Sequence, residues 1–410
     1  MTATDVRVEP IQPLTEPVAS LAQYRATGGG TGLAEALSAG PEAVIAEVRA
    51  AGLRGRGGAG FQTAAKWAAT RSSDGPVSVV CNAAEGGLGT FKDRFILRRN
   101  AYQVLEGLAI ATVAVGARRA YIGIRGVCRV EIAALVRALD EMCAARLLGP
   151  ASIRLVVGPD EYRFGEEHAM FAAADVDSSV VVNNVETLAH VPAVLRLGAN
   201  GFREVGTPDS PGTTVFTLSG DVRVPGLYEL PLGVPLRVLI DLFGAGTPSG
   251  RPVKAVFPGA GAAPLTGARL DVPLDYESLG AVGSALGAGG LVVYDDSTCM
   301  VAAALASCRF LATQPAGQCR ACQQRDQRIA TSLGRIERGE GTNGDLAVLH
   351  LGGGQRCCPP TGTATLVRGL LAEFADEFAA HVGRPCPRPR DLPTPRLADF
   401  DEDGARFSYA

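Results

Sequence analysis

The residues best suited to chemistry are glycines and basic side chains gathered in residues 52–67. Gly55-x-Gly57-x-x-Gly60 has the spacing of a dinucleotide-binding fingerprint, in which backbone N–H groups approach a phosphate closely. That fingerprint follows a strand, whereas a helical run over residues 43–50 precedes this loop, so the match alone is weak. The basic side chains of the segment are Arg54, Arg56 and Lys66. We expect the loop to hold a flat or anionic ligand, the alternative being a mobile surface loop.

Polar segments also follow the apolar runs that we expect to be strands. These segments are residues 81–94, 162–168 and 183–187. Ligands of open parallel sheets bind beyond the carboxyl ends of the strands, so polar residues at several such ends predict one shared crevice. The alternative is that Asn183 and Thr187 serve only as helix-cap residues.

The ten cysteines offer a second kind of chemistry. The N-terminal segment MTATDVRVEPIQPL has no apolar run, so we expect no signal peptide, a cytoplasmic location and no disulfide framework. The cysteines are then buried thiols or metal ligands. The four histidines lack metal-ligand spacing, and we expect each of them on the surface or at a helix cap. They are His168, His190, His350 and His381.

Composition narrows the classes of function. The 410 residues include 39 basic and 42 acidic side chains, a net charge of −3, so we expect no nucleic-acid partner. The longest apolar stretch, residues 107–117, is shorter than the ~20 residues of a membrane span, so we expect no direct membrane insertion.

The elements that must position these residues form an α/β pattern. Short apolar runs separated by helical runs over residues 41–210 predict a parallel sheet covered on both faces. The expected strands are 77–81, 120–124, 153–157 and 180–182. Helical periodicity begins at Pro41, and residues 1–40 are predicted to form an N-terminal arm.

The pattern changes near residue 211. Residues 211–297 predict a small α+β domain of ubiquitin-like order, with strands at 213–219, 221–230, 253–257 and 291–294 and a helix at 235–243. Residues 298–383 predict helices at 299–313, 325–338, 344–351 and 363–382. The last of them carries an apolar stripe of Leu366, Leu370, Phe374 and Phe378. Residues 384–410 predict an extended proline-rich tail that lies on a partner or on the protein's own surface.

Read together, these segments resemble the flavin- and NADH-binding subunit of respiratory complex I, which NAD-linked formate dehydrogenases and bidirectional hydrogenases share. The matching segments are GLRGRGGAGF–TAAKW (52–67), CNAAE–GTFKDR (81–94), AYIGIRG (120–126), GEE (165–167), NNVETLAHVP (183–192), SGDVRVPGLYELPLG (219–233) and TCM (298–300). They occur in order and cover most of residues 41–382, so the resemblance is specific.

The resemblance implies a Rossmann-like domain for FMN and NAD(H) over 41–210, a soluble-ligand-binding (SLBB) β-grasp domain over 211–297 and an iron–sulfur four-helix bundle over 298–383. It implies that the FMN pocket is lined by Gly55, Arg56, Gly57, Gly58, Ala59, Lys66, Asn82, Glu85, Tyr162, Gly165, Glu166 and Asn183. The FMN phosphate would lie near Asn184 and Thr187, and NADH would stack beside Phe61 and Glu167. No catalytic side chain is assigned, with Glu85 and Glu167 nearest the chemistry.

The cysteine motif departs from the family pattern. Relatives carry Cys-x-x-Cys-x-x-Cys and a later cysteine for a [4Fe-4S] cluster, but the first ligand is here Ala316. The remaining ligands are Cys319, Cys322 and Cys358, with Cys357 or Cys308 as candidates for the fourth. The alternatives are a zinc site of two to four sulfurs or thiols that bind nothing.

The nucleotide-binding residues depart as well. Relatives carry a longer insert with a Lys-Pro-Pro-Phe-like segment between Glu167 and Asn183, and an aromatic residue where this chain has Ala68-Ala69. Acidic residues of the second motif are replaced by Ala84 and Gly87. Because each lost aromatic contact removes on the order of 1 kcal/mol, we expect FMN binding to be better preserved than NADH binding.

The sequence therefore predicts an FMN-dependent NADH dehydrogenase subunit that passes electrons from NAD(P)H to an iron–sulfur centre. One alternative is a flavin protein that exchanges electrons with a ferredoxin-like partner without tight NADH binding. Another is a non-catalytic assembly or ligand-binding relative. The resemblance implies a thioredoxin-like [2Fe-2S] subunit and a larger iron–sulfur or ferredoxin-type protein as partners, which could place the chain at the periphery of the inner membrane.

Overall fold

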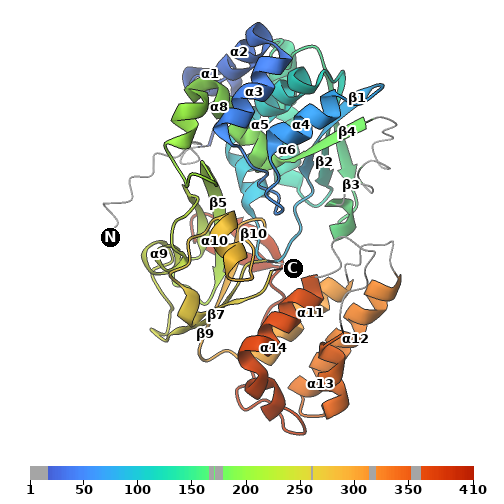
Figure 1. Ribbon diagram of the computed structural model, residues 1–410, viewed down its shortest axis with the longest axis vertical. Helices are drawn as coiled ribbons and strands as arrows, with labels where there is room; N and C mark the ends of the chain where they lie inside the picture. Colours follow the sequence, from blue (N-terminus) through green and yellow to red (C-terminus); the bar gives the residue numbers. More distant parts are fainter. Residues whose placement is uncertain (1–16, 166–169, 171–178, 260–261, 314–319, 352–361) are drawn as a thin grey trace. The chain divides into compact units, whose positions relative to one another are not determined.

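The computed structural model describes residues 17–165, 170, 179–259, 262–313, 320–351 and 362–410 (Figure 1). The chain divides into two compact units. The first unit comprises Met1–Glu85, Lys92–Val215 and Glu229–Gly233, and the second comprises Gly86–Phe91, Phe216–Tyr228 and Val234–Ala410.

The first unit contains a four-stranded parallel sheet in the order β3-β2-β1-β4. Its strands are β1 (Val77–Ala83), β2 (Arg119–Arg125), β3 (Ser152–Gly158) and β4 (Ser179–Asn184). All four expected strands are present, and each extends beyond its predicted range. One face packs Val80, Tyr121 and Val182 against Phe164 and Met170. Valine and isoleucine runs suit this buried, pleated surface.

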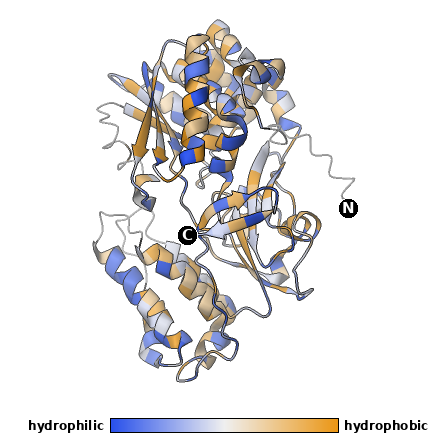
Figure 2. Ribbon diagram, turned by 180° about the vertical axis from the view of Figure 1, so that it is seen from behind, coloured by the Kyte–Doolittle hydropathy of each residue, from blue (hydrophilic) through white to orange (hydrophobic). Residues whose placement is uncertain are grey.

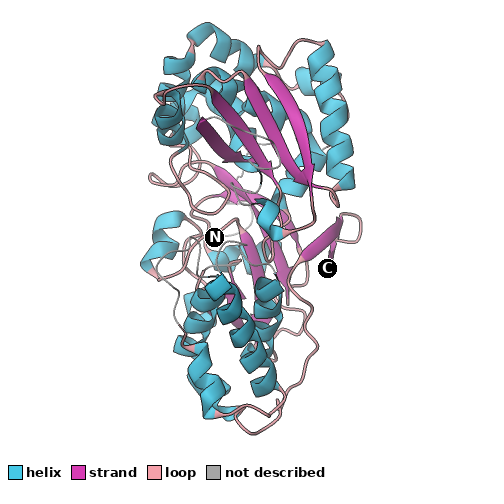
Figure 3. Cartoon of the chain, turned by 90° about the vertical axis from the view of Figure 1, so that its right-hand side faces the viewer, coloured by secondary structure: helices cyan, strands magenta, loops and turns pink. Residues whose placement is uncertain are grey.

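Helices pack beside this sheet (Figure 3). They are α1 (Leu21–Ala26), α2 (Thr31–Ala39), α3 (Pro41–Ala51), α4 (Thr63–Arg71), α5 (Lys92–Val115), α6 (Arg129–Ala144), α8 (Val185–Arg203) and the 3-10 turn η1 (Tyr162–Gly165). The central helix α5 contacts α6, α8 and β1, and its Leu105 and Leu108 are fully buried. The crossovers return each parallel strand to the same edge, which is the geometry that gathers ligand-binding loops.

Helical structure begins earlier than the sequence predicts, because α1 and α2 precede Pro41. The carboxylate of Glu106 on α5 explains this difference. It accepts hydrogen bonds from the Tyr24 hydroxyl, from the Gly30 N–H (2.7 Å) and from the Leu33 N–H (2.9 Å). Helices of six and nine residues are marginal alone, so this tertiary anchor and not periodicity specifies them.

A five-stranded sheet in the order β6-β5-β9-β7-β8 has most of its residues in the second unit. Its strands are β5 (Thr213–Gly220), β6 (Gly226–Pro231), β7 (Val253–Phe257), β8 (Leu265–Thr266) and β9 (Gly290–Asp295). The short turns of helix are α9 (Leu236–Val238), η2 (Leu239–Phe243), η3 (Gly267–Arg269) and α10 (Tyr276–Ala281). The β5–β9 pair is parallel, and β7 runs antiparallel to both β8 and β9.

Further helices follow in the described residues after 299, with hydrophilic and hydrophobic residues interspersed along them (Figure 2). They are α11 (Met300–Thr313), α12 (Arg320–Glu337), α13 (Asn343–Leu349) and α14 (Gly362–Ala380). Leu366, Leu370 and Phe378 of the expected stripe are buried with Leu333 of α12. Phe374 is partly buried and packs against the same cluster, although its backbone leaves the helical region (φ −131°, ψ 28°).

The C-terminal tail is only partly extended. The sequence predicts an extended segment over 384–410, but β10 (Leu397–Asp401) and β11 (Arg406–Tyr409) form an antiparallel hairpin. The rings of Phe400 and Phe407, 4.5 Å apart, stabilise this pair across the strands. The preceding segment lies on the protein's own second unit through the Arg390–Asp221 ion pair of 2.6 Å. Among the described residues, no helix combines the length and apolar character needed to cross a bilayer.

Candidate cofactor site

Polar side chains of the first unit meet at the carboxyl edge of β1 and β4, as the sequence predicts. Asn82 and Asn184 are register partners on these neighbouring strands. The Asn82 amide donates to the Gly165 carbonyl (2.8 Å), and its oxygen accepts from the Ala84 N–H (3.1 Å). These bonds attach the η1 turn to the end of β1, so the predicted polar segments 81–94 and 162–168 lie next to each other.

The start of α8 faces the same edge because β4 runs directly into it. Asn184 is the N-cap, and its side-chain oxygen accepts from the Glu186 N–H at 3.0 Å. The first turn of a helix presents unpaired N–H groups and the positive end of the helix dipole. This edge is therefore suited to an anionic group such as a phosphate.

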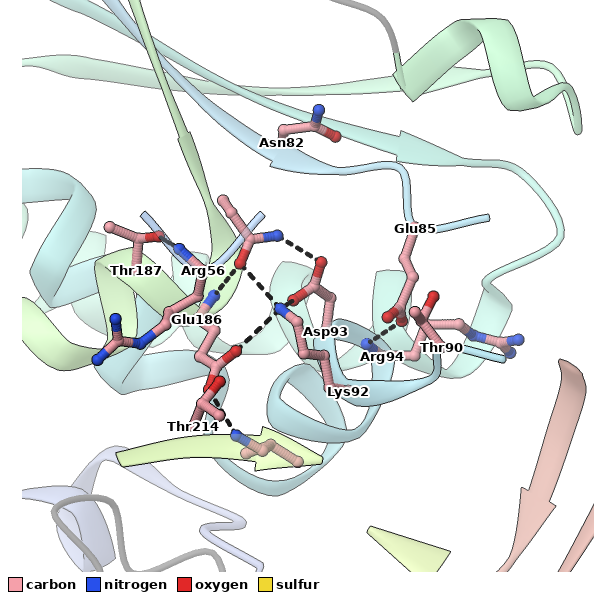
Figure 4. Close-up of polar contacts among 12 residues, drawn as sticks. Arg56, Asn82, Glu85, Thr90, Lys92, Asp93, Arg94, Glu186, Thr187 and Thr214 are labelled. Atoms are coloured by element: carbon pink, nitrogen blue, oxygen red, sulfur yellow. Dashed lines mark hydrogen bonds and ion pairs between the residues drawn. The ribbon is translucent and has the colours of Figure 1, made fainter. Parts of the chain in front are cut away.

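A buried ion cluster is formed by Lys92, Asp93 and Glu186 (Figure 4), and it fixes the orientation of Asn184. The Lys92 ammonium lies 2.6 Å from Asp93 Oδ1, 2.9 Å from Glu186 Oε2 and 3.1 Å from Asn184 Oδ1. The Asn184 amide also donates to Asp93 Oδ2 at 2.5 Å. Burial alone would lower the pKa of Lys92, but the charges of Asp93 and Glu186 outweigh it and raise that pKa. Lys92 is thus held as a cation.

Glu186 connects this cluster to the polypeptide that follows α8. Its Oε1 accepts from the Thr214 hydroxyl (2.9 Å) and from the Val215 N–H (2.7 Å). Lys92, Asp93 and Glu186 lie in the predicted polar segments, but the sequence did not identify them as site residues. In the sequence these are three charged residues in the first turns of α5 and α8, where charged residues are common. Only their burial distinguishes them from ordinary helix-terminal charges.

The glycine loop lies against the start of α8. A Cβ at Gly57 would come 3.2 Å from the Asn184 Cβ, so glycine permits this close approach. The Arg56 N–H donates to the Thr187 hydroxyl at 2.8 Å. As expected, the helix α3 and not a strand precedes the loop.

The Arg56 side chain does not have the role expected of it. Its guanidinium is buried and donates to the carbonyls of Thr213 (3.1 Å), Pro211 (2.9 Å) and Arg54 (3.2 Å). The sequence predicts phosphate binding by this charge, but its donors are directed to the backbone. Arg56 therefore shapes the loop.

Lys66 and Trp67 of α4 attach this helix to the end of β4. The Lys66 ammonium donates to the Val182 carbonyl (2.8 Å), and the Trp67 indole N–H donates to Asn183 Oδ1 (2.9 Å). Lys66 is only half-buried and has two further donors, so it can also contact an anion.

Glu85 is a buried carboxyl at the end of β1 whose pKa is raised into the neutral range. Its Oε2 accepts from the Arg94 N–H at 3.1 Å, whereas Oε1 is buried with no hydrogen-bond partner in the described part of the chain. Burial, reinforced by the nearby charge of Asp93, raises the pKa of Glu85 to about 7. A proton or a ligand donor would satisfy the buried oxygen.

Other predicted residues are less informative. Phe61 is 67% exposed, so its ring is accessible for stacking. Glu166, Glu167, Cys319, Cys357 and Cys358 lie outside the described residues, as do the side chains of Tyr162 and Cys322. Cys308 is fully buried within α11.

The histidine prediction is partly wrong. His190 is fully buried in α8, contrary to the expected surface or cap position. His381 is also buried, but it directly follows α14 and its Nδ1 donates to the Glu377 carbonyl in the last turn of that helix, which is a helix-cap position. Burial lowers the pKa of His190 well below its ordinary value, with the charge of Arg56 adding to the effect. His350 is the C-cap of α13, as expected, and His168 lies outside the described residues.

A parallel α/β unit with a glycine loop at its ligand edge defines a nucleotide- or flavin-binding class of protein. Comparison with known families refines this. Residues 48–193 match the Nuo51 FMN-binding domain, and residues 302–381 match the NADH-ubiquinone oxidoreductase-F iron–sulfur binding region.

Individual relatives agree with both matches. The chain is 39% identical to the NADH-quinone oxidoreductase F subunit 2 of Rhizobium meliloti (strain 1021), over 90% of this chain and 96% of the relative. It is 35% identical to the HndC subunit of the NADP-reducing hydrogenase of Solidesulfovibrio fructosivorans, over 90% and 82% of the two chains. A crystal structure of an NAD+-reducing [NiFe]-hydrogenase in the H2-reduced state superposes with a TM-score of 0.79 at 30% identity, covering 91% of this chain and 68% of that one.

The chain belongs to the family of NADH-quinone oxidoreductase F subunits. It is an FMN-binding oxidoreductase subunit of the NADH dehydrogenase type, in which electrons pass from NAD(P)H through FMN toward iron–sulfur.

The raised pKa of Glu85 predicts a pH-dependent stability of the first unit. The folded chain holds this proton more tightly than the unfolded chain, where the carboxyl has its ordinary pKa of 4.5. The stabilisation is complete below that value and is lost as the pH rises through about 7. In flavin-free protein, Glu85→Gln should therefore reduce the fall in melting temperature between about pH 5 and about pH 8.

Trp67 emission measures this melting, because the only tryptophan of the chain is buried in the first unit. Glu204→Gln, at an exposed carboxyl of the same unit, is the matched control and should keep the wild-type pH profile. Equal pH profiles for Glu85→Gln and the wild type would contradict the raised pKa.

Proposed function

We propose that FMN binds at the carboxyl edge of β1 and β4, with its phosphate at the start of α8 and its ring system beside the glycine loop. The start of α8 supports this best, because its first turn lies at this edge and the Asn184 side chain accepts only the Glu186 N–H of that turn. Thr187 accepts from the Arg56 N–H and retains its own hydroxyl proton for a phosphate oxygen. Lys66 adds positive charge from α4.

The side chains at this edge bind and orient, and none of them is required to react. Bound FMN supplies hydride acceptance and one-electron release, which no amino-acid side chain provides. Asn183 accepts from Trp67, so its amide N–H groups stay available to a ring carbonyl. The buried Glu85 Oε1 can accept from a ligand N–H, or hold a proton and donate it, because its pKa lies near 7.

The exposed ring of Phe61 is the proposed stacking partner of the nicotinamide nucleotide. Glu167 is proposed as a second contact of that nucleotide. The chain has Ala68 and Ala69 where the family has an aromatic residue, and it lacks the long insert before Asn183. We infer that the nucleotide binds less tightly than FMN, because the aromatic contact area is smaller.

The second unit is proposed to hold an SLBB β-grasp domain and a cluster-binding bundle, consistent with the five-stranded sheet and α11–α14. Cys319, Cys322 and Cys358 are the proposed thiolate ligands of a [4Fe-4S] cluster, completed by Cys357 or Cys308. A thioredoxin-like [2Fe-2S] subunit and a larger iron–sulfur or ferredoxin-type protein are the proposed partners.

Anaerobic titration with NADH tests the proposed substrate. NADH should bleach most of the flavin absorbance of the FMN-loaded protein, because the hydride passes to the ring.

The location of the FMN site is tested by a substitution in the glycine loop. Gly57→Val should bind FMN at least about tenfold more weakly, since its side chain would press on Asn184. Gly280→Ala is the control, because a Cβ there meets no atom within 4 Å.

Two results would overturn parts of this proposal. Protein that holds FMN but is bleached by neither NADH nor NADPH, yet is reduced by ferredoxin, would identify the ferredoxin-linked alternative. Protein that stays colourless after reconstitution with FMN and iron–sulfur would identify a non-catalytic relative.

Iron content tests the incomplete cysteine motif. If a cysteine outside the usual motif position supplies the fourth thiolate, the wild type should lose iron faster than Ala316→Cys, which restores the missing ligand of the motif. Iron per chain is measured after timed exposure to a chelator, starting from about four irons. Ala316→Ser, which offers no thiolate, is the matched control, and equal rates of iron loss for all three proteins would contradict the proposed ligand set.

A further inference from the structure

Three metal-ligating side chains meet in the second unit, apart from the cysteines of the family cluster motif. They are Cys299, His381 and Cys386, and their ligand atoms all lie within 4.8 Å of one another. Cys299 Sγ is 3.3 Å from His381 Nε2. The three residues come from separate places in the chain, immediately before α11, immediately after α14 and in the segment that follows.

The imidazole of His381 is oriented as it would be in a metal site. Its Nδ1 donates to the Glu377 carbonyl at 2.7 Å, which leaves Nε2 as the free acceptor directed at Cys299. Metal-bound histidines commonly donate their second ring N–H to a backbone carbonyl or carboxylate, which fixes the ring and the tautomer. His381 is also only 3% exposed, so this geometry is held by its packing.

Glu377, whose carbonyl binds His381, also fixes the backbone next to Cys299. Glu377 Oε1 accepts from the Met300 N–H at 3.0 Å and from the Lys254 ammonium at 3.0 Å. Lys254 donates in addition to the Thr298 carbonyl at 2.8 Å. The Glu377 carboxylate is therefore paired with other groups. The Glu377 carbonyl orients His381, and its carboxylate orients the backbone that carries Cys299.

We propose that Cys299, His381 and Cys386 bind one zinc ion, with a water molecule in the fourth position. Tetrahedral zinc, with Zn–S near 2.3 Å and Zn–N near 2.0–2.1 Å, separates a sulfur from a nitrogen by about 3.6 Å and two sulfurs by about 3.8 Å. The observed 3.3 Å between Cys299 and His381 and the 4.8 Å limit for the set are compatible with both separations. Two thiolates and an imidazole suit zinc, whereas calcium and magnesium require oxygen ligands.

The zinc would join the start of α11 to the segment after α14. It would be a site of its own, distinct from a zinc bound in place of the [4Fe-4S] cluster. It does not depend on flavin or nucleotide binding in the first unit.

Metal analysis of the full chain tests the proposal. After loading with Zn²⁺ and gel filtration, the wild type should retain about one zinc per chain with two sulfur ligands in its zinc-edge X-ray absorption spectrum. Cys386→Ser and His381→Gln should lose most of this zinc and leave the iron content unchanged. Cys143→Ser and His350→Gln, at an exposed thiol and an exposed imidazole, are the matched controls and should retain the zinc.

Each remaining outcome overturns the proposal. A wild type without zinc excludes the site, and so does a zinc content that the two ligand variants do not change. A zinc shell of three or four sulfurs would place the ion at the cluster cysteines instead. A Cys299–Cys386 disulfide, detected by mass spectrometry without reductant, would show that the close sulfurs serve a covalent link. The wild-type absorption spectrum decides the matter even if a variant fails to fold.

Discussion

The carboxyl edge of β1 and β4, where we propose that FMN binds, depends on one buried cation, Lys92, placed between the carboxylates of Asp93 and Glu186. Removing one partner from a buried ion pair costs about 3–5 kcal/mol, because the remaining charge stays buried without compensation. The cluster therefore forms as a unit. It orients Asn184, which caps α8, and it connects α8 to the backbone at Val215.

The charge of Asp93 also influences the protonation state of Glu85. Asp93 acts on Glu85, whose burial already favours the protonated form, so the carboxyl can exist in either state near neutral pH. Chain connectivity produces this proximity, since β1 is followed by Glu85 and then by α5, which begins at Lys92, while β4 runs into α8. Parallel strands deliver both helix starts to one edge of the sheet.

The sequence predicted what depends on local pattern. Apolar runs identified β1 to β4, and the order of polar segments identified the shared edge that Asn82 and Asn184 occupy. It could not predict features decided by tertiary contacts. Glu106 lies far from α1 and α2 in the sequence but binds them in the fold. The Arg56 side chain is directed to backbone carbonyls, and His381 contacts Cys299, which is 82 positions away in the sequence.

The FMN affinity of the Lys92→Met variant tests the central claim most directly. The affinity is measured by quenching of flavin fluorescence, and Trp67 emission reports that the first unit of the variant is folded. We expect a dissociation constant at least about tenfold higher than that of the wild type, because Asn184 and the start of α8 lose their alignment. A folded Lys92→Met protein with wild-type FMN affinity would contradict this role of the buried cation.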